Sequence, residues 1–346
     1  MTKTVVIVAD IHDSYQGLKS FYKQDWESKD SIGYLQSTIE NLGFQTIVLE
    51  PKSGMEKILN YLKKITNEIR FGKRRRMDTI LFNLVEGFSS RNREGYIPSI
   101  AEFLGIPHTG SDAYAQSVSL DKNLCKSIAE KLGIPVKPHI VIRKRDDLSH
   151  IKLDRTKLWK PNLEGSGISI SEKNILNHRN DLKKIESCLD KHSEILIEEY
   201  LPGEEYTLGV IGIRGKYKPT KAANLIFPGS VYGYKVKKKS DMPEKLEFNV
   251  DLGTEKKLQE YSIRISEEIG VSGYARFDYR CDKSGKPNFL EANLTCGLSY
   301  KYSTFPLCYT HSFQKKYSDM VQEILDFALE EFKNPRFSYG KFSSGQ

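Results

Sequence analysis

The sequence predicts a Rossmann-like α/β domain at the amino terminus, followed by a region of mixed α+β character. Three apolar runs rich in β-branched residues indicate buried strands: Thr4–Ala9, Thr46–Leu49 and Thr79–Leu84. Strands of a parallel sheet form such runs because helices cover both faces of the sheet. Helix-like segments separate the three runs. This βαβ alternation is typical of a Rossmann-like domain, which we expect to span residues 1–114.

The segments between these strands have the spacing of amphipathic helices. Gly33–Leu42 and Met55–Ile69 are predicted helices, and the second carries apolar residues at helical intervals. A third helix is expected over Tyr96–Leu104, before a short strand-like stretch at Pro107–Gly110. These elements complete the predicted first domain.

A second set of elements begins after Gly110. The helix Asp121–Leu132 ends before Gly133, a common stop signal, and the strand His139–Ile142 then opens a new domain. We expect a helix near Asp181–Leu189, a strand over Glu194–Tyr200, and a final helix over Tyr317–Phe332. Residues 333–346 are predicted to form a loose tail.

Composition narrows the class of protein. The chain has 346 residues, of which 38% are hydrophobic and 28% charged, as expected of a globular protein with two or three domains. It has no apolar run long enough for a membrane helix and no signal-peptide cleavage pattern, so we expect no membrane association and a cytoplasmic location. The five scattered cysteines predict free thiols.

The net charge of +8 owes seven positive charges to two runs, Lys73–Arg76 and Lys237–Lys239. A nucleic-acid-binding site would need basic residues interleaved with stacking aromatics, or a known module, and neither run has that setting. The first run is interpreted as a solvated loop, and no nucleic-acid partner is expected. An RNA-binding function would rest on charge alone.

Four polar residues near the carboxyl-terminal third carry the clearest chemical signal. Alternate residues of a strand share a face, so Arg276 and Asp278 point the same way, as do Glu291 and Asn293. The turn-rich connector Cys281–Pro287 favours an antiparallel hairpin. Two carboxylates and an amide would then converge beside a guanidinium, a set of oxygen ligands that suits Mg²⁺. The alternative is a hairpin with a solvated polar face.

Weaker signals indicate a nucleotide. Lys160 ends an apolar strand, where a charge needs a partner such as a phosphate, and the loop Glu164–Gly167 allows close approach of backbone N–H groups. Lys122 begins a helix after a loop, and Glu198 and Glu205 flank a strand, turn, strand unit. Considered singly, Lys122, Glu198 and Glu205 are each better explained as surface side chains.

The order of these motifs resembles the ATP-grasp ligases, most closely the D-alanine:D-alanine ligases, from about Leu81 to Leu329. The resemblance implies an ATP-grasp fold that holds ATP between a small lobe, residues 115–202, and a large lobe, residues 203–332. It implies a peptide-bond-forming ligase in which an acyl phosphate is made with release of ADP and phosphate. The substrates would be ATP and small amino acids or peptides.

The resemblance also implies roles for individual residues. Lys122 and Lys160 would contact the phosphates of ATP. Glu198 and Leu201 would contact the adenine, and Glu205 the ribose. Lys237 would belong to a lid formed by Phe227–Lys238. Two Mg²⁺ ions, with Mn²⁺ as an alternative, would be held by Asp278, Glu291 and Asn293. Arg276 would stabilise charge on the reacting carboxylate, together with backbone N–H groups near Gly297, and Ser166 would close over the reacting centre.

The chain departs from the family pattern where amino-acid substrates would bind. Ala9–Ser14 replaces a Gly-rich turn that carries a glutamate, so Asp10 or Asp13 is a candidate replacement. Leu294–Tyr302 and Gly87–Gly95 also differ. The substrate pair therefore stays open: D-alanine with D-alanine is one candidate, and another amino-acid or peptide pair is the second. A non-catalytic nucleotide-binding module is a third interpretation. The oligomeric state is also open, with a homodimer as one option.

Overall fold

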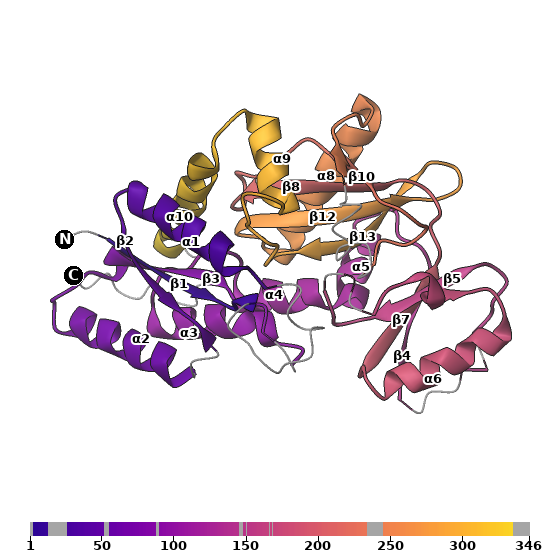
Figure 1. Cartoon of the computed structure of the whole chain (residues 1–346), viewed down its shortest axis with the longest axis horizontal. Coiled ribbons are helices and arrows are strands. Elements are labelled where there is room, and N and C mark those ends of the chain that lie inside the picture. The colour runs from indigo at the N-terminus through magenta and orange to yellow at the C-terminus, as the bar shows by residue number, and fades with distance from the viewer. Residues whose placement is uncertain are drawn as a thin grey trace.

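The computed structural model describes residues 3–12, 26–51, 55–87, 90–144, 148–149, 151–165, 167, 169–233 and 245–334. Ser166, Lys237 and most of the predicted tail lie outside these residues. The chain forms three units, each built around its own sheet (Figure 1). The consecutive helices α4 (Ala113–Leu120) and α5 (Lys122–Lys131) connect the first sheet to the sheet that begins with β4. No described helix is long and apolar enough to cross a membrane.

The first unit has a parallel sheet, as predicted, and its strand order is β2–β1–β3. Its strands are β1 (Thr4–Ala9), β2 (Gln45–Leu49) and β3 (Thr79–Leu84). The strand-like stretch after the third helix pairs with β3 only through a bridge between Leu81 and His108. The predicted Rossmann-like topology is therefore confirmed in its central three strands.

Helices cover both faces of this sheet. They are α1 (Lys29–Asn41), α2 (Met55–Arg70) and α3 (Tyr96–Leu104), with short 3₁₀ helices η4 (Arg76–Asp78) and η5 (Arg93–Gly95). Helix α1 begins four residues earlier than predicted because the Ser28 hydroxyl caps it, accepting from the Ser31 N–H. Helices α2 and α3 pack on one face of the sheet.

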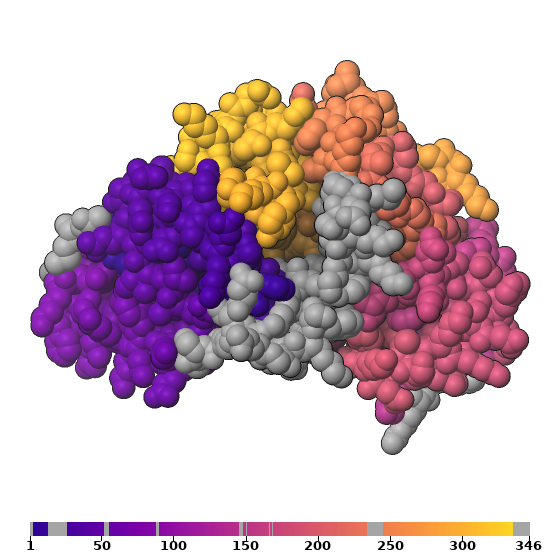
Figure 2. Space-filling view, viewed as in Figure 1, coloured from indigo at the N-terminus to yellow at the C-terminus, as the bar shows by residue number. Residues whose placement is uncertain are grey.

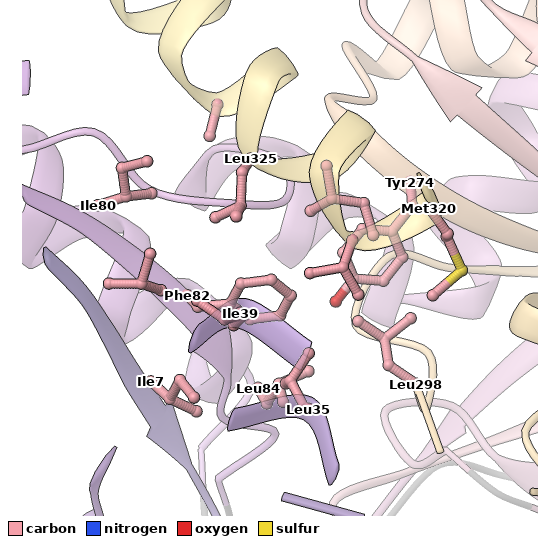
Figure 3. Close-up of a cluster of buried hydrophobic side chains, with 14 of the residues drawn as sticks. Ile7, Leu35, Ile39, Ile80, Phe82, Leu84, Tyr274, Leu298, Met320 and Leu325 are labelled. Carbon is pink, nitrogen blue, oxygen red and sulfur yellow. The ribbon is translucent and has the colours of Figure 1, made fainter. Parts of the chain in front are cut away.

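The opposite face is covered by α1 and, unexpectedly, by the last helix of the chain, α10 (Tyr317–Lys333). Leu325 and Met320 of α10 belong to one cluster with Ile80 and Phe82 of the first sheet and with Tyr274 of the large lobe. Figure 3 shows Met320 beside Tyr274 in this cluster. The carboxyl-terminal helix therefore joins the first domain to the large lobe through one hydrophobic core. In the space-filling view the amino-terminal and carboxyl-terminal segments form a continuous surface (Figure 2).

The large lobe contains a six-stranded antiparallel sheet. Its elements are β8 (Glu205–Gly212), β9 (Lys218–Pro219), β10 (Ala223–Ile226), β11 (Lys245–Glu247), α8 (Leu252–Ile269), β12 (Gly273–Cys281), β13 (Pro287–Asn293) and α9 (Thr304–Phe313). The order is β11–β10–β8–β12–β13, with β9 beside β8. Residues of α4, α5 and α8 bury one face of the sheet in a shared apolar cluster.

The small lobe has a four-stranded antiparallel sheet in the order β4–β7–β5–β6. Its elements are β4 (His139–Arg143), β5 (Lys157–Pro161), η6 (Glu172–Asn174), β6 (Ile175–Leu176), η7 (Arg179–Leu182), α6 (Lys183–Leu189) and β7 (Glu194–Glu199). Helix α6 covers this sheet at the end of the molecule away from the first domain (Figure 1). The division at residues 114, 202 and 332 stays a prediction.

The basic run before β3 has partners inside the first domain. Arg74 pairs with Glu68 at 2.9 Å, Arg75 pairs with Asp78 at 2.9 Å, and Arg76 donates to the Leu104 carbonyl. The solvated-loop interpretation was therefore incomplete, because these arginines bind neighbouring acidic and carbonyl groups. All five cysteines are free thiols, as predicted.

Candidate functional site

Strands β12 and β13 form the predicted hairpin. Asp278 lies opposite Glu291, and Arg276 lies opposite Asn293. Directly opposed side chains of an antiparallel pair are about 5 Å apart at Cβ, so the register brings the two carboxylates together. Phe277 packs on the opposite face of the sheet in the large-lobe core. The alternation that predicted this platform is therefore confirmed.

Asp278 is the centre of the platform. Its carboxylate accepts hydrogen bonds from Arg276 Nη2 at 2.9 Å, Thr207 Oγ1 at 2.8 Å and Asn293 Nδ2 at 3.0 Å. Burial alone would lower the pKa of Arg276, but the adjacent Asp278 outweighs it and the pKa is raised well above its usual range. This guanidinium is a fixed positive charge beside the site.

Lys122 and Glu291 form the second pair of the platform. Asp121 caps helix α5 by accepting from the Leu124 N–H, and Lys122 in the first turn extends to Glu291 Oε2 at 3.0 Å. Burial raises the pKa of the Glu291 carboxyl, yet the ammonium groups of Lys122 and Lys160 hold it well below its ordinary value. Lys122 is thus buried and paired, whereas the alternative interpretation expected it in solvent.

Glu198 lies between two lysines. Its Oε1 is 2.7 Å from Lys160 Nζ of β5, and its Oε2 is 2.9 Å from Lys126 Nζ of α5. All three side chains are almost fully buried. Burial raises the pKa of Glu198, but the two ammonium groups outweigh it and hold the pKa at about 2. Lys126 also donates to the Phe289 carbonyl at 2.9 Å, so this cluster joins the small lobe to the large lobe.

Sequence reasoning did not identify Lys126. It stands one helical turn after Lys122 and is the more deeply buried of the two. Desolvation lowers its pKa, opposed mainly by Glu198. A lysine on an amphipathic helix gives no local sign of its burial, because its acidic partner, Glu198, lies on a strand 72 residues later in the sequence.

Glu205 begins β8 and pairs with Arg280, whose Nη1 is 3.3 Å from Glu205 Oε2. Burial raises the pKa of Glu205 to about 7, partly offset by Arg280. Arg280 also donates to the Gly203 carbonyl at 3.2 Å and the Ser230 carbonyl at 2.6 Å. Arg280 was not predicted as a site residue, although it continues the alternation that runs through Arg276 and Asp278.

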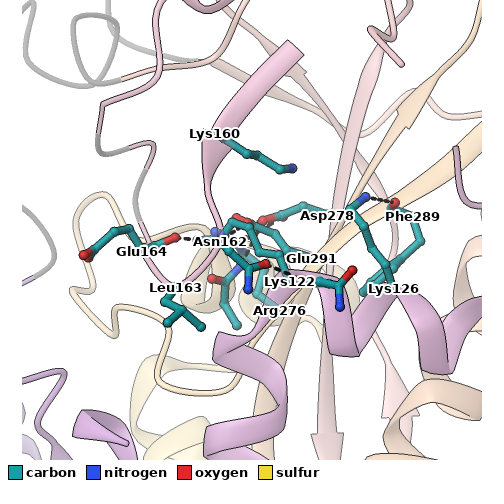
Figure 4. Close-up of polar contacts among 12 residues, drawn as sticks. Lys122, Lys126, Lys160, Asn162, Leu163, Glu164, Arg276, Asp278, Phe289 and Glu291 are labelled. Carbon is teal, nitrogen blue, oxygen red and sulfur yellow. Dashed lines mark hydrogen bonds and ion pairs between the residues drawn. The ribbon is translucent and has the colours of Figure 1, made fainter. Parts of the chain in front are cut away.

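These side chains line one cavity between the two lobes. The predicted residues on its wall are Lys122, Lys160, Glu198, Leu201, Glu205, Arg276, Asp278 and Glu291. Leu158, Leu290 and Val231 add apolar surface. Lys160 enters from the small lobe, while Arg276, Asp278 and Glu291 come from the large-lobe sheet (Figure 4). Asn293 adjoins the cavity through Asp278. The cavity thus has apolar and highly charged parts, as a nucleotide requires.

The charges around this cavity nearly balance. Among the described residues, four cations, Lys122, Lys160, Arg276 and Arg280, and five carboxylates, Glu198, Glu199, Glu205, Asp278 and Glu291, line it. The ammonium and guanidinium groups can face phosphate oxygens, and the carboxylates suit a divalent cation. A polyphosphate with its bound cation is a ligand that this arrangement can hold.

Two of the predicted site residues, Ser166 and Lys237, lie outside the described residues, but described neighbours of each line the cavity. Gly167 lies in the loop after Lys160, and Tyr232 lies in the first part of the predicted lid. Gly233 is next to that loop: a Cβ at Gly233 would lie 2.1 Å from the Ile170 carbonyl oxygen. Glu172 accepts from the Ser230 hydroxyl at 3.2 Å. The start of the predicted lid therefore packs directly on the loop.

The donor set of the platform fits a hard divalent cation. Asp278 and Glu291 supply carboxylate oxygens and Asn293 an amide, with no sulfur or imidazole donor among the three. Within the described part of the chain no group of three or more His, Cys, Asp or Glu side chains could hold a metal ion. Further oxygen donors would have to come from phosphate or water, as is usual for Mg²⁺.

The expected amino-acid region contains two buried carboxylates. Asp10 accepts from the Gly87 N–H at 2.8 Å, and burial raises its pKa to about 6; Asp13 lies outside the described residues. Glu27, which the sequence analysis did not consider, accepts from the Leu298 and Ser299 N–H groups at 2.7 and 3.1 Å. Glu27 therefore holds the loop after Asn293, and nothing local in the sequence signals this contact across 271 residues.

Comparison with known proteins gives consistent results. Residues 128–326 match the family model described as "D-ala D-ala ligase C-terminus". The D-alanine–D-alanine ligase of Aquifex aeolicus is 32% identical over 208 residues, which cover 60% of this chain and 69% of that protein. The enzyme of the same name from Flavobacterium psychrophilum is 29% identical over 231 residues, covering 66% of this chain and 69% of that protein.

Solved structures are similar over nearly the whole chain. The D-alanine–D-alanine ligase from Bacillus anthracis complexed with ATP has a TM-score of 0.72 at 20% identity, covering 96% of this chain and 99% of that one. The VanG D-Ala:D-Ser ligase from Enterococcus faecalis has a TM-score of 0.71 at 19% identity, covering 95% and 100%. The expected fold, a Rossmann-like domain followed by two ATP-grasp lobes, is therefore confirmed.

Proposed function

The chain belongs to the D-alanine–D-alanine ligase family of ATP-dependent ligases, and we propose that it joins the carboxylate of one amino acid or peptide to the amine of another through an acyl phosphate. One observation carries the proposal. The candidate phosphate, ribose and carboxylate residues and two of the three candidate metal residues, which are spread over some 170 positions, line a single cavity. D-Alanine with D-alanine is the first substrate pair to test. ATP is supplied inside cells, so a cytoplasmic location is part of the proposal.

The nucleotide would lie with its base between the lobes. Leu158, Leu201 and Leu290 offer apolar surface for adenine, and the strand end at Glu198 offers backbone groups that can read its edge. Glu205 would accept hydrogen bonds from ribose hydroxyls. Lys122 and Lys160 would face the phosphates, where an ammonium acts as a compact positive charge.

Asp278, Glu291 and Asn293 would hold two Mg²⁺ ions, or Mn²⁺ ions instead. The metal would neutralise charge on the phosphoryl oxygens. In the first step an oxygen of the substrate carboxylate attacks the γ-phosphorus of ATP and ADP leaves. Catalysis of such a step is mainly positioning and charge neutralisation. Lys122, Lys160 and Arg276 are supported in these roles by their burial and fixed partners.

In the second step the amine attacks the acyl carbon, and phosphate leaves as the amide forms. The tetrahedral intermediate carries an oxyanion, which preformed donors stabilise. Arg276 can donate there because Asp278 keeps it charged and oriented. Backbone N–H groups near Gly297 are the second proposed donors. Water must be excluded during this step, a role proposed for Ser166 in the loop and for the lid that includes Lys237.

The test is to incubate the protein with Mg-ATP and pools of D- and L-amino acids, then measure phosphate release and identify products by mass. An amino-acid-dependent amide product would support the proposal. ATP turnover without any amino-acid dependence would count against a ligase, and a product other than D-alanyl-D-alanine would reject that substrate pair.

A single substitution tests the metal assignment. Glu291→Gln keeps the size of the side chain but removes a carboxylate, so we expect turnover to fall at least 100-fold, a typical cost of losing one strong electrostatic contact in the transition state. Circular dichroism should show that the fold persists. The exposed Glu268 offers a matched control, since Glu268→Gln should leave turnover unchanged. Unchanged activity in Glu291→Gln would remove the assignment.

A further inference from the structure

The loop after Lys160 is held by contacts from helix α5 and from the first domain. Lys122 donates from Nζ to the Glu164 carbonyl. Arg93, from the 3₁₀ helix η5 of the first domain, donates from Nη1 to the Leu163 carbonyl at 2.8 Å, and its Nη2 lies 3.7 Å from Glu164 Oε2. The loop and its contacts with Lys122 lie beside the platform in Figure 4. Arg93 thus joins the first domain to a loop whose next residues, Gly165 and Gly167, have no side chain to restrain them.

The main chain at Arg93 is itself held in place. Gly87 has φ +63°, and a Cβ there would lie 3.0 Å from Arg93 Cβ, so the two backbones are in close contact. The Gly87 N–H donates to Asp10 Oδ2 at 2.8 Å, at the end of β1. The Arg93 side chain is only 8% exposed. A rigid edge of the first sheet therefore supports a guanidinium that reaches a loop of another domain.

We propose that Arg93 is a positioning residue that holds residues 162–165 of the loop against the reacting centre. The inference rests on the proposed ligase function. A hydrogen bond to the Leu163 carbonyl fixes the main chain two residues before Gly165, and the contact with Glu164 adds a second restraint on the same segment. The loop then shields the acyl phosphate from water, which closed active-site loops commonly do.

A guanidinium suits this position because it can donate to a carbonyl and face a carboxylate at once. A lysine can reach one of the two, and a methionine neither. Loss of the contact should leave the nucleotide in place, since Lys122, Lys160 and Glu205 are unchanged, but should let water reach the intermediate. Phosphate would then be released without an amide product.

The variants to compare are Arg93→Met, Arg93→Lys and the control Arg91→Met, in which an exposed arginine two residues away is changed. For Arg93→Met we expect amide formation at saturating ATP to fall at least tenfold. Phosphate released per amide should rise several-fold, and the KM for ATP should change less than threefold. Arg93→Lys should lie between this variant and the wild type, and Arg91→Met should stay within twofold of it.

Hydrogen exchange supplies a readout that does not require activity. Backbone amides of residues 162–165 should exchange at least tenfold faster in Arg93→Met than in the wild type, with no change in Arg91→Met. Unchanged exchange and an unchanged ratio of phosphate to amide would overturn the role of Arg93. If the wild-type protein forms no amide, the ligase function is rejected. Faster exchange of the loop in Arg93→Met would still support the contact between Arg93 and the loop. If Arg93→Met does not fold, Arg93→Lys gives the same comparison.

Discussion

Removing the charge of Glu198 should destabilise the protein more than removing either lysine beside it. Glu198 is buried between Lys126 and Lys160, at 2.9 and 2.7 Å. Its pKa is held at about 2, against an ordinary value of 4.5. Since one pKa unit corresponds to about 1.4 kcal/mol, the two lysines favour the ionised carboxylate by roughly 3 kcal/mol after its burial is included.

Glu198→Gln keeps the shape of the side chain but leaves two buried ammonium groups without a counter-charge. Breaking a buried ion pair from one side costs about 3–5 kcal/mol, which agrees with the value derived from the pKa. Lys126→Met should cost less, because Glu198 keeps Lys160 as its partner. The double variant Glu198→Gln with Lys126→Met should be more stable than Glu198→Gln alone, since only one ammonium then needs a partner.

The pH dependence gives this prediction a second signature. Burial already lowers the pKa of Lys126 in the folded state below the ordinary 10.5, and loss of the opposing charge of Glu198 should lower it further. The unfolded chain then binds more protons than the folded one between the lowered pKa and 10.5, so the stability of the variant rises with pH across that window. The deficit relative to the wild type should therefore shrink from pH 7 to pH 10.

Equilibrium unfolding in urea, followed by circular dichroism, measures these differences. An exposed pair supplies the control: Lys144 and Asp190 are both about two-thirds exposed, so Asp190→Asn should cost less than about 1 kcal/mol. A loss below about 1 kcal/mol in Glu198→Gln would refute the reasoning. So would a double variant no more stable than Glu198→Gln.

Two further pH effects follow from buried carboxyls. Glu205, whose pKa burial raises to about 7, accepts more strongly from ribose hydroxyls when it is ionised, so adenosine binding measured without metal should tighten as pH rises through 7; Glu205→Gln should abolish that slope, and a slope that persists would reject the assignment. Asp10, with a pKa near 6 against 3.8, keeps a proton that the unfolded chain loses, so wild-type stability falls between pH 4 and 6 by roughly 3 kcal/mol. Asp10→Asn does not titrate and should be nearly as stable as the wild type at pH 4 but clearly more stable at pH 7; a difference independent of pH would contradict this.

The sequence was most informative where chemistry and periodicity coincide. The hairpin of β12 and β13 could be predicted because alternation fixes the face of each side chain and a short connector fixes the pairing. Strands β1, β2 and β3 could be predicted as readily, since few other elements contain unbroken runs of β-branched residues. Helix α4 was missed: its sequence, AYAQSVSL, contains serine and valine and no charged residue, so it lacks an amphipathic pattern. Asp112 caps it by accepting from the Ala115 N–H, a signal that is common in turns as well.

The missed site residues share a different property. Arg93, Lys126, Arg280 and Glu27 are all charged and buried, and each contacts an element 50 to 271 residues away. A charged residue on a helix or loop is most often exposed, so local pattern alone assigns it to the surface. Once the fold is known, a buried charge indicates partners, because a charged side chain stays buried only where its partners compensate for the lost water. In this chain Arg93, Lys126 and Glu27 bind groups of another domain, whereas the partners of Arg280 lie in its own lobe. Substituting the first three should therefore alter domain coupling before it alters any one domain.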